Sequence, residues 1–242
     1  MSKILWACLA GFLLSATANA QDNNNKKEEP ETIEGNGKLV TRDVHVSSFD
    51  ALQASGVYEL KLSQGNSESV KIEADENLQD LFDVHNEGNK LVIGMKKLEN
   101  KNLRIKDKMT VYVTFRKLKD LSLKTVGNVK SDEQLNFDDL TLNNKSVGNI
   151  SLKLNADKLE LTNKSVGHVR LEGKAQNAVF RNSGVGSLDA SNFVVQTMDI
   201  ENAGIGSARV NAEKNLKVKE GMTGRVHNQG AAQPRRIRRV QI

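Results

Sequence analysis

The sequence predicts an all-β chain folded as a single-stranded β-solenoid, similar to a parallel β-helix, with coils of about 18–21 residues. Three observations point to this fold. A Val-Gly phrase recurs between residues 121 and 226, apolar residues keep the same place in each copy, and the segments between copies are too short for a packed helix. Alternating strands before the repeat are expected as its first coils or as a β cap.

Each copy of the phrase is centred on a glycine. These glycines lie 21, 19, 19, 20 and 18 residues apart, and such a period is typical of stacked repeats. We interpret them as corners, where glycine permits a positive φ or the close approach of adjacent coils. The structural repeat glycines are Gly127, Gly148, Gly167, Gly186, Gly206 and Gly224.

Counting from each glycine separates the repeat into columns. The positions six before and two after the glycine are apolar in all six copies, which predicts ladders of core side chains. Asparagine stands four residues before the glycine in four consecutive copies, at Asn144, Asn163, Asn182 and Asn202. A stacked column of this kind predicts a ladder of side-chain hydrogen bonds, which is a structural role rather than a ligand site.

The residue directly after each glycine varies between copies. It lies between inward-facing positions, so we expect its side chain to point outward. This column is the predicted exposed binding column, and it consists of Asn128, Asn149, His168, Ser187, Ser207 and Arg225.

Residues 1–20 have the features of a secretory signal peptide. A single positive residue, Lys3, precedes an apolar run over residues 4–14, and Ala-Asn-Ala then predicts cleavage after Ala20. The only cysteine, Cys8, falls in this leader, so the mature chain has no thiol for a disulfide or a metal site. A lipoprotein signal around Cys8 is the alternative, although most of the apolar run follows that residue.

The rest of the chain divides into three parts. Residues 21–37 are polar and are predicted to be a disordered spacer, residues 38–230 the solenoid domain, and residues 231–242 a basic tail. The formal charge of +5 becomes +4 without Lys3, and four arginines of the tail account for it. A near-neutral body argues against nucleic-acid binding, and the tail is either a solvated end or a contact for anionic lipid or polysaccharide.

Short alternating runs fill the first part of the solenoid domain. Strands are expected over residues 57–62, 70–73, 82–85, 90–95 and 109–115. Weaker patterns near residues 80–81 and 99–104 suit short helical turns. No apolar stretch of the mature chain approaches the ~20 residues of a membrane-spanning helix.

The chain resembles the putative auto-transporter adhesin, head GIN domain family, which is exported mainly by Bacteroidetes. The matching residues are Phe-Asp-Ala-Leu at 49–52, the segment 55–65, the segment 88–93 and the glycine-bearing repeats, so the likeness spans about residues 46–230. The resemblance implies a β-solenoid and a role in adhesion. The chain departs from the family pattern in its Ser-Val-Gly corners at 146–148 and 165–167 and in an altered closing phrase at 226–230. These departures leave the expected fold unchanged, and no family ligand is carried over to this chain.

Catalytic chemistry finds little support in the sequence. A carbohydrate-active β-helix enzyme needs acids that converge from neighbouring coils, but Asp138 and Asp157 share a column that continues with Gln176. The histidines show no zinc-binding spacing, and no phosphate-binding or calcium-binding motif occurs. We therefore expect no catalytic, metal or cofactor site.

The leading hypothesis is an exported, non-catalytic protein of the periplasm or the cell surface. It would act like an adhesin by binding surface glycans or envelope proteins through one face of the solenoid. Two alternatives remain open at this point: a homo-oligomeric scaffold formed by end-to-end strand pairing, and a carbohydrate-active enzyme.

Overall fold

A computed structural model describes residues 31–99 and 101–237 of the chain. The predicted signal peptide, the first part of the predicted spacer and the last five residues of the tail lie outside the described residues. The elements in chain order are β1 (Glu31–Glu34), β2 (Leu39–Val44), β3 (Ala51–Val57), β4 (Glu59–Gln64), β5 (Ser69–Asp75), η1 (Glu76–Leu81), β6 (Phe82–Glu87), β7 (Lys90–Met95), β8 (Lys101–Arg104), β9 (Thr110–Phe115), β10 (Asp120–Val126), β11 (Val129–Lys130), β12 (Leu135–Asn144), β13 (Ile150–Asn163), β14 (Val169–Asn182), β15 (Leu188–Asn202), β16 (Ser207–Glu220), β17 (Arg225–Asn228) and β18 (Pro234–Arg236).

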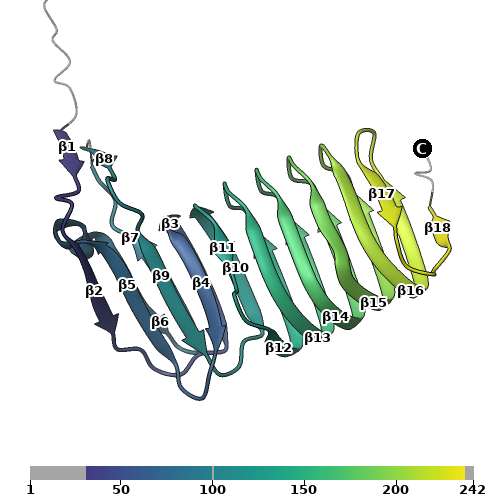
Figure 1. Cartoon of the computed structure of the whole chain (residues 1–242), viewed down its shortest axis with the longest axis horizontal. Helices are drawn as coiled ribbons and strands as arrows, with labels where there is room; N and C mark the ends of the chain where they lie inside the picture. Colours follow the sequence, from purple (N-terminus) through teal and green to yellow (C-terminus); the bar gives the residue numbers. More distant parts are fainter. Residues whose placement is uncertain (1–30, 100, 238–242) are drawn as a thin grey trace, which may run out of the picture.

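The repeat forms a straight stack of parallel coils (Figure 1). Strands β13 to β16 each continue through most of one coil, and every coil pairs with the next so that equivalent columns face each other. Val129 pairs with Ile150, which pairs with Val169, for example. The register shifts between β14 and β15 and again between β15 and β16, where the repeat length changes. The predicted β-solenoid is confirmed.

The core is a set of apolar ladders inside the coils. The columns six before and two after the corner glycine are buried in every copy from Leu121 to Val226. Aromatic rings fill the wider places, where Phe180 stacks on Phe193 with ring centroids 6.4 Å apart. A column of identical inward positions buries its side chains only if all coils stay in register, so the apolar ladders also fix the alignment of the stack.

The N-terminal strands form both coils and a cap. β3 and β4 make one coil, parallel to β10 and β11, while β7 and β9 make a further coil outside it. The order of these coils in space therefore differs from their order in the chain. β5 and β6 run antiparallel to β9 and β7, and β2 pairs antiparallel with β5, so that this layer with η1 closes the end of the stack.

Three expectations about the ends need correction. Residues 31–37 were predicted as disordered spacer, but β1 lies there and pairs in parallel with β8, with a Lys101–Glu31 ion pair of 2.7 Å and Ile33 partly buried against the core. Residues 101–104 are this strand rather than a helical turn, whereas η1 includes the helical turn expected at 80–81. In the predicted tail, β18 pairs with β16, because the second half of β16 has no partner in β17.

No helix among the described residues has the length and apolar character needed to cross a membrane.

Candidate functional site

The corners hold the coils unusually close together. Gly127, Gly148, Gly167, Gly186 and Gly206 all have φ between 127° and 147°, which side chains other than glycine rarely adopt. A Cβ at Gly167 would lie 2.1 Å from the carbonyl oxygen of Gly148. Gly224 differs, since its φ is not positive, yet a Cβ there would lie 2.3 Å from the carbonyl oxygen of Asn202. The role of these glycines is therefore structural: they allow the backbones of adjacent coils to approach closely at the corner.

The asparagine column is buried beside the corners and forms a continuous ladder. The Nδ2 of Asn144 donates to the Oδ1 of Asn163, and the same bond joins Asn163 to Asn182 and Asn182 to Asn202, each at 2.7 Å. Asn202, at the end of the ladder, donates to the carbonyl oxygens of Gly206 and Arg225. All four side chains are occupied with each other and with the backbone, which leaves them unable to bind a ligand from outside.

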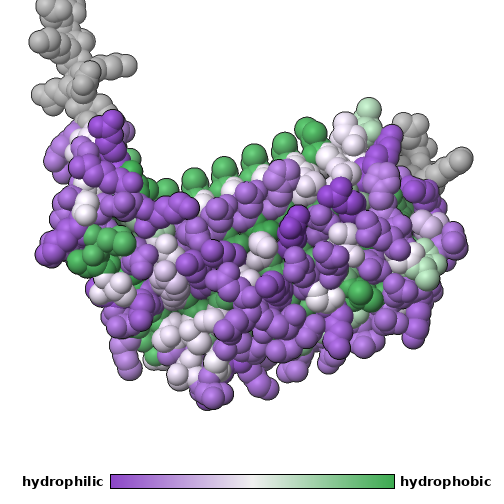
Figure 2. Space-filling view, viewed as in Figure 1, coloured by the Kyte–Doolittle hydropathy of each residue, from purple (hydrophilic) through white to green (hydrophobic). Residues whose placement is uncertain are grey.

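A row of exposed aliphatic side chains runs along the outside of the corners. We call it the aliphatic ridge, and it consists of Val57, Val126, Val147, Val166, Val185 and Ile205. Their exposed fractions lie between 39% and 62%, although most large apolar residues of this chain are fully buried. Figure 2 shows them as green knobs at regular intervals along one edge of an otherwise mainly polar surface. The spacing is that of adjacent parallel strands, about 4.8 Å.

The direction of these side chains follows from alternation along the strand. The residues two and four before the corner glycine point inward, as buried Ser146 and Asn144 illustrate, so the residue between the glycine and the inward serine points outward. The backbone of the ridge is fully hydrogen-bonded along the stack, with Val147 N donating to Thr125 O and Gly148 N donating to Val166 O. The equivalent position of the last copy is Thr223, so a corner of this fold accepts a polar β-branched residue and does not require an aliphatic one.

The predicted exposed binding column lies directly beside the ridge. Asn128, Asn149, His168 and Arg225 are exposed, and Ser187 and Ser207 are half-buried. Several of these side chains are tied to the next coil: the Oδ1 of Asn149 accepts from His168 N at 3.0 Å, and His168 Nδ1 lies 2.7 Å from Ser187 Oγ. The column therefore forms a polar flank of the ridge, and part of its hydrogen-bonding capacity is already used.

Lysines form the other flank. Lys124, Lys145 and Lys164 stand three residues before the glycine in consecutive coils, and all three are exposed; we call them the lysine row. Between residues 124 and 225, no acidic residue occupies the lysine-row, ridge or polar-flank positions of a corner. Glu59, in the coil before them, is mostly buried and pairs with Lys130 at 3.3 Å. We call the lysine row, the aliphatic ridge and the polar flank together the corner edge. This edge combines apolar and cationic groups.

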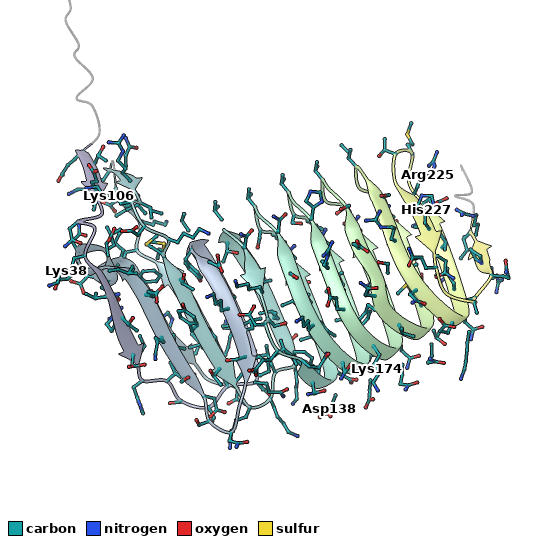
Figure 3. All side chains as sticks on the ribbon, viewed as in Figure 1. Lys38, Lys106, Asp138, Lys174, Arg225 and His227 are labelled. Atoms are coloured by element: carbon teal, nitrogen blue, oxygen red, sulfur yellow. The ribbon has the colours of Figure 1, made fainter. Side chains whose placement is uncertain are left out.

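The aliphatic ridge was not predicted from the sequence, because function was expected at the variable positions of the repeat. The sequence does contain the information that places it. The residues two and four before the glycine point inward, so the valine directly before the glycine must point outward. The opposite edge of the solenoid is different in character: Figure 3 shows Asp138 and Lys174 there, far from Arg225 at the corner edge. A shallow hollow of about 650 Å³ lies on that opposite edge, lined mainly by small and amide residues such as Asn155, Ala175 and Gln176.

Acidic residues in the repeat are scattered, and several of them pair with cations. Lys158 lowers the pKa of Glu160, while Asp199 and Glu201 pair with lysines of β16 at 2.7 and 2.8 Å. Asp189 accepts a hydrogen bond of 2.6 Å from the Ser191 hydroxyl, which, with Arg209, lowers its pKa to about 2 against the effect of burial. Carboxylates held in the charged form are poor general acids near neutral pH.

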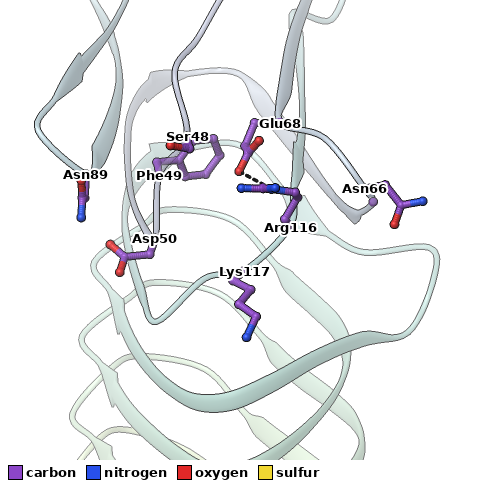
Figure 4. Close-up of a pocket in the computed structure, with 9 residues that line it drawn as sticks. Ser48, Phe49, Asp50, Asn66, Glu68, Asn89, Arg116 and Lys117 are labelled. Carbon is purple, nitrogen blue, oxygen red and sulfur yellow. Dashed lines mark hydrogen bonds and ion pairs between the residues drawn. The ribbon is translucent and has the colours of Figure 1, made fainter.

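A second hollow of about 650 Å³ lies at the capped end (Figure 4). Its acids do not converge, because Glu68 points to Arg116 at 3.0 Å while Asp50 points away and pairs with Lys119 at 3.2 Å. Within the residues that the structure describes, no cluster of three His, Cys, Asp or Glu side chains could hold a metal ion. Neither hollow brings a pair of free acids together.

A family model described as "Putative auto-transporter adhesin, head GIN domain" matches residues 48–232. The chain belongs to this family. The match extends from just before β3 to just after β17, so the head GIN domain includes the stack from β3 to β17 and the whole aliphatic ridge, while β2 of the cap and β18 lie outside it. No curated protein matches the chain.

Solved structures share the fold of this head GIN domain. A putative adhesin from Bacteroides fragilis NCTC 9343 is 28% identical with a TM-score of 0.72, and the match covers 85% of this chain and 100% of that one. A putative lipid binding protein from Parabacteroides distasonis ATCC 8503 is 18% identical (TM-score 0.61, 86% and 100% covered), and a putative adhesin from Parabacteroides merdae ATCC 43184 is 20% identical (TM-score 0.56, 86% and 100% covered). The family and these neighbours are described as binding proteins rather than enzymes.

Proposed function

We propose that this chain is an exported, adhesin-like protein of the cell envelope that binds surface molecules through the corner edge of its solenoid. The observation that carries the proposal is the aliphatic ridge, which repeats over six coils without being required by the core. Contiguous apolar groups on a soluble surface mark interaction sites far more often than scattered ones do. The adhesin family and the signal-peptide pattern of residues 1–20 support the same role and an exported location.

The absence of catalysis is part of the proposal. It is supported by the pairing of Asp199 and Glu201 with lysines of β16 and by the divergent acids of the hollow at the capped end. The coils differ at their surfaces but repeat their corners, which suits a long contact face better than a single reactive centre.

The test is binding of purified residues 21–242 to intact cells and to envelope fractions. Val166→Ser removes one exposed ridge side chain, and Val194→Ser is its matched control, because Val194 is 36% exposed at the opposite edge. We expect Val166→Ser to weaken binding and Val194→Ser to leave it unchanged. Equal binding by both variants and the unaltered chain would show that the corner edge is not the contact surface.

A further inference from the structure

The chemistry of the corner edge restricts its partner. The ridge positions from Val57 to Ile205 are all aliphatic, and no Phe, Tyr or Trp occupies the lysine-row or polar-flank positions between residues 124 and 225. A sugar ring would find no aromatic face to stack on. Aliphatic groups of this kind gain most from an environment that is itself aliphatic.

The charge beside the ridge adds a second requirement. Lys124, Lys145 and Lys164 lie on one flank, and Arg225 stands at the C-terminal end of the other. Three carboxylates within five residues of a corner glycine are already paired: Asp189 with Arg209 at 3.0 Å, Glu201 with Lys219 at 2.8 Å, and Glu220 with Arg236. The free charge of this edge is therefore positive, and a complementary partner is anionic as well as apolar.

A second copy of the chain fits this requirement poorly. Two corner edges packed ridge to ridge would place each lysine row against either the other lysine row or the polar flank, which carries Arg225 and no acidic residue. No acidic residue of these columns between 124 and 225 would neutralise it. Like charges brought together at an interface oppose association.

The C-terminal end of the edge protrudes most. Ile205 is 62% exposed, and Met222, in the last corner loop before β17, is 94% exposed. This loop stands highest of the corner loops in Figure 1, and the β1–β8 pair rises beyond the ridge at the other end. A flat surface laid on this edge would thus meet an aliphatic tip at one end and β8, with Lys101 and Arg104, at the other.

We propose that the corner edge docks on an anionic lipid bilayer. The C-terminal part of the ridge lies at the boundary of headgroups and acyl chains, and the lysine row contacts lipid phosphates. Apolar insertion combined with cationic flanks is the usual basis of reversible attachment to a membrane surface. The inference rests on the proposed function, because it names the partner of the same edge.

The test is co-sedimentation of residues 21–242 with vesicles of phosphatidylglycerol and phosphatidylcholine, compared with phosphatidylcholine alone. We expect binding to the anionic vesicles only, and weaker binding when salt shortens the Debye length from about 10 Å at 0.1 M to about 3 Å at 1 M. A Lys124→Gln, Lys145→Gln, Lys164→Gln variant should bind at least about tenfold more weakly, since each lysine near such a surface contributes about 1 kcal/mol.

A matched variant controls for net charge. Lys153→Gln, Lys174→Gln, Lys214→Gln removes three exposed lysines outside the lysine row, the ridge and the polar flank and should change binding by less than about twofold. Ile205→Ser should also weaken binding, and Val194→Ser should not. Far-UV circular dichroism of each variant establishes that the solenoid is intact.

The outcomes separate the two proposals. Ridge-dependent binding to envelope fractions without binding to any vesicle overturns the lipid inference, identifies a surface glycan or protein as the partner and leaves the proposed function standing. Equal losses in the two triple variants also overturn it, because they indicate attraction by net charge alone. Absence of binding to vesicles and to envelope fractions refutes both proposals.

Discussion

Replacing Asn163 by alanine tests whether the asparagine ladder holds the coils in register. In the folded chain the Oδ1 of Asn163 accepts from Asn144 Nδ2 at 2.7 Å and from Ser165 Oγ at 2.8 Å, while its Nδ2 donates to Asn182 at 2.7 Å. The substitution removes all three bonds. It leaves the Asn144 amide and the Ser165 hydroxyl buried without an acceptor.

The expected loss follows from those orphaned groups. A buried donor without a partner costs about 1–3 kcal/mol, so two of them predict a decrease of about 2–6 kcal/mol in the free energy of unfolding. Part of this is recovered if water enters the space or the two donors find other acceptors. The change would be a large fraction of the stability of an ordinary domain.

Urea unfolding followed by far-UV circular dichroism measures the effect. The control is Asn143→Ala, which removes a half-buried side chain of the preceding coil at the position paired with Thr162. The slope with urea must be compared too, because stacked repeats can unfold in parts. A loss for Asn163→Ala below about 1 kcal/mol, or equal to that of the control, would refute a stabilising role of the ladder.

The remaining predictions concern the corners, an ion pair, an end strand and the ridge. Gly167→Ala should cost more than about 3 kcal/mol in unfolding free energy, because φ is 136° and the Cβ would meet backbone at 2.1 Å. The lowered pKa of Asp189 should contribute about 2 kcal/mol to the free energy of unfolding above pH 3.8, the pKa of the unfolded state. This contribution should be lost as the pH falls towards 2, and the Asp189→Asn variant should not show that loss. Deleting residues 234–242 uncovers part of β16, and sedimentation should then show association. Val166→Ser should change stability by less than about 1 kcal/mol.

A loss of stability above about 1 kcal/mol for Val166→Ser would mean that this ridge side chain supports the fold. The other three predictions have the following contradicting results. Unaltered stability of the Gly167 variant would mean that the corner backbone relaxes easily. If the free energy of unfolding falls equally with pH in the unaltered chain and in Asp189→Asn, the Asp189 carboxylate does not stabilise the fold. A monomeric deletion variant would count against end-to-end pairing, the scaffold alternative that the strand edges suggested.

The repeat made most of the fold predictable. A glycine every 18 to 21 residues and two apolar columns require stacked coils, and a column of asparagines suggests a ladder, because each such feature depends only on equivalent positions lying above one another. The order of the first coils could not be predicted. Alternation identifies the β3 and β7 segments as strands, but it does not say which of them lies next to β10.

The ends and the site were harder to predict for different reasons. β1 and β18 are short and polar, so their own sequences do not predict strands. Each forms by pairing with a strand that has a free edge, β1 with β8 and β18 with the second half of β16. The polar flank was predicted residue by residue, but the ridge beside it was overlooked, since a recurring valine was assumed to belong to the repeat's architecture. Exposure, rather than variation, distinguishes a surface valine such as Val147 from a core residue such as Ile150.

A fluorescent probe on the ridge tests most directly whether the corner edge is the contact surface. The only cysteine of the sequence is Cys8, so Val166→Cys in residues 21–242 gives a single site for a polarity-sensitive dye, and Lys174→Cys gives the matched site at the opposite edge. On adding envelope membranes, the dye at position 166 should shift to the blue and gain intensity, while the dye at position 174 should not change. Equal shifts at both positions, or a shift at position 174 alone, would contradict a contact through the corner edge.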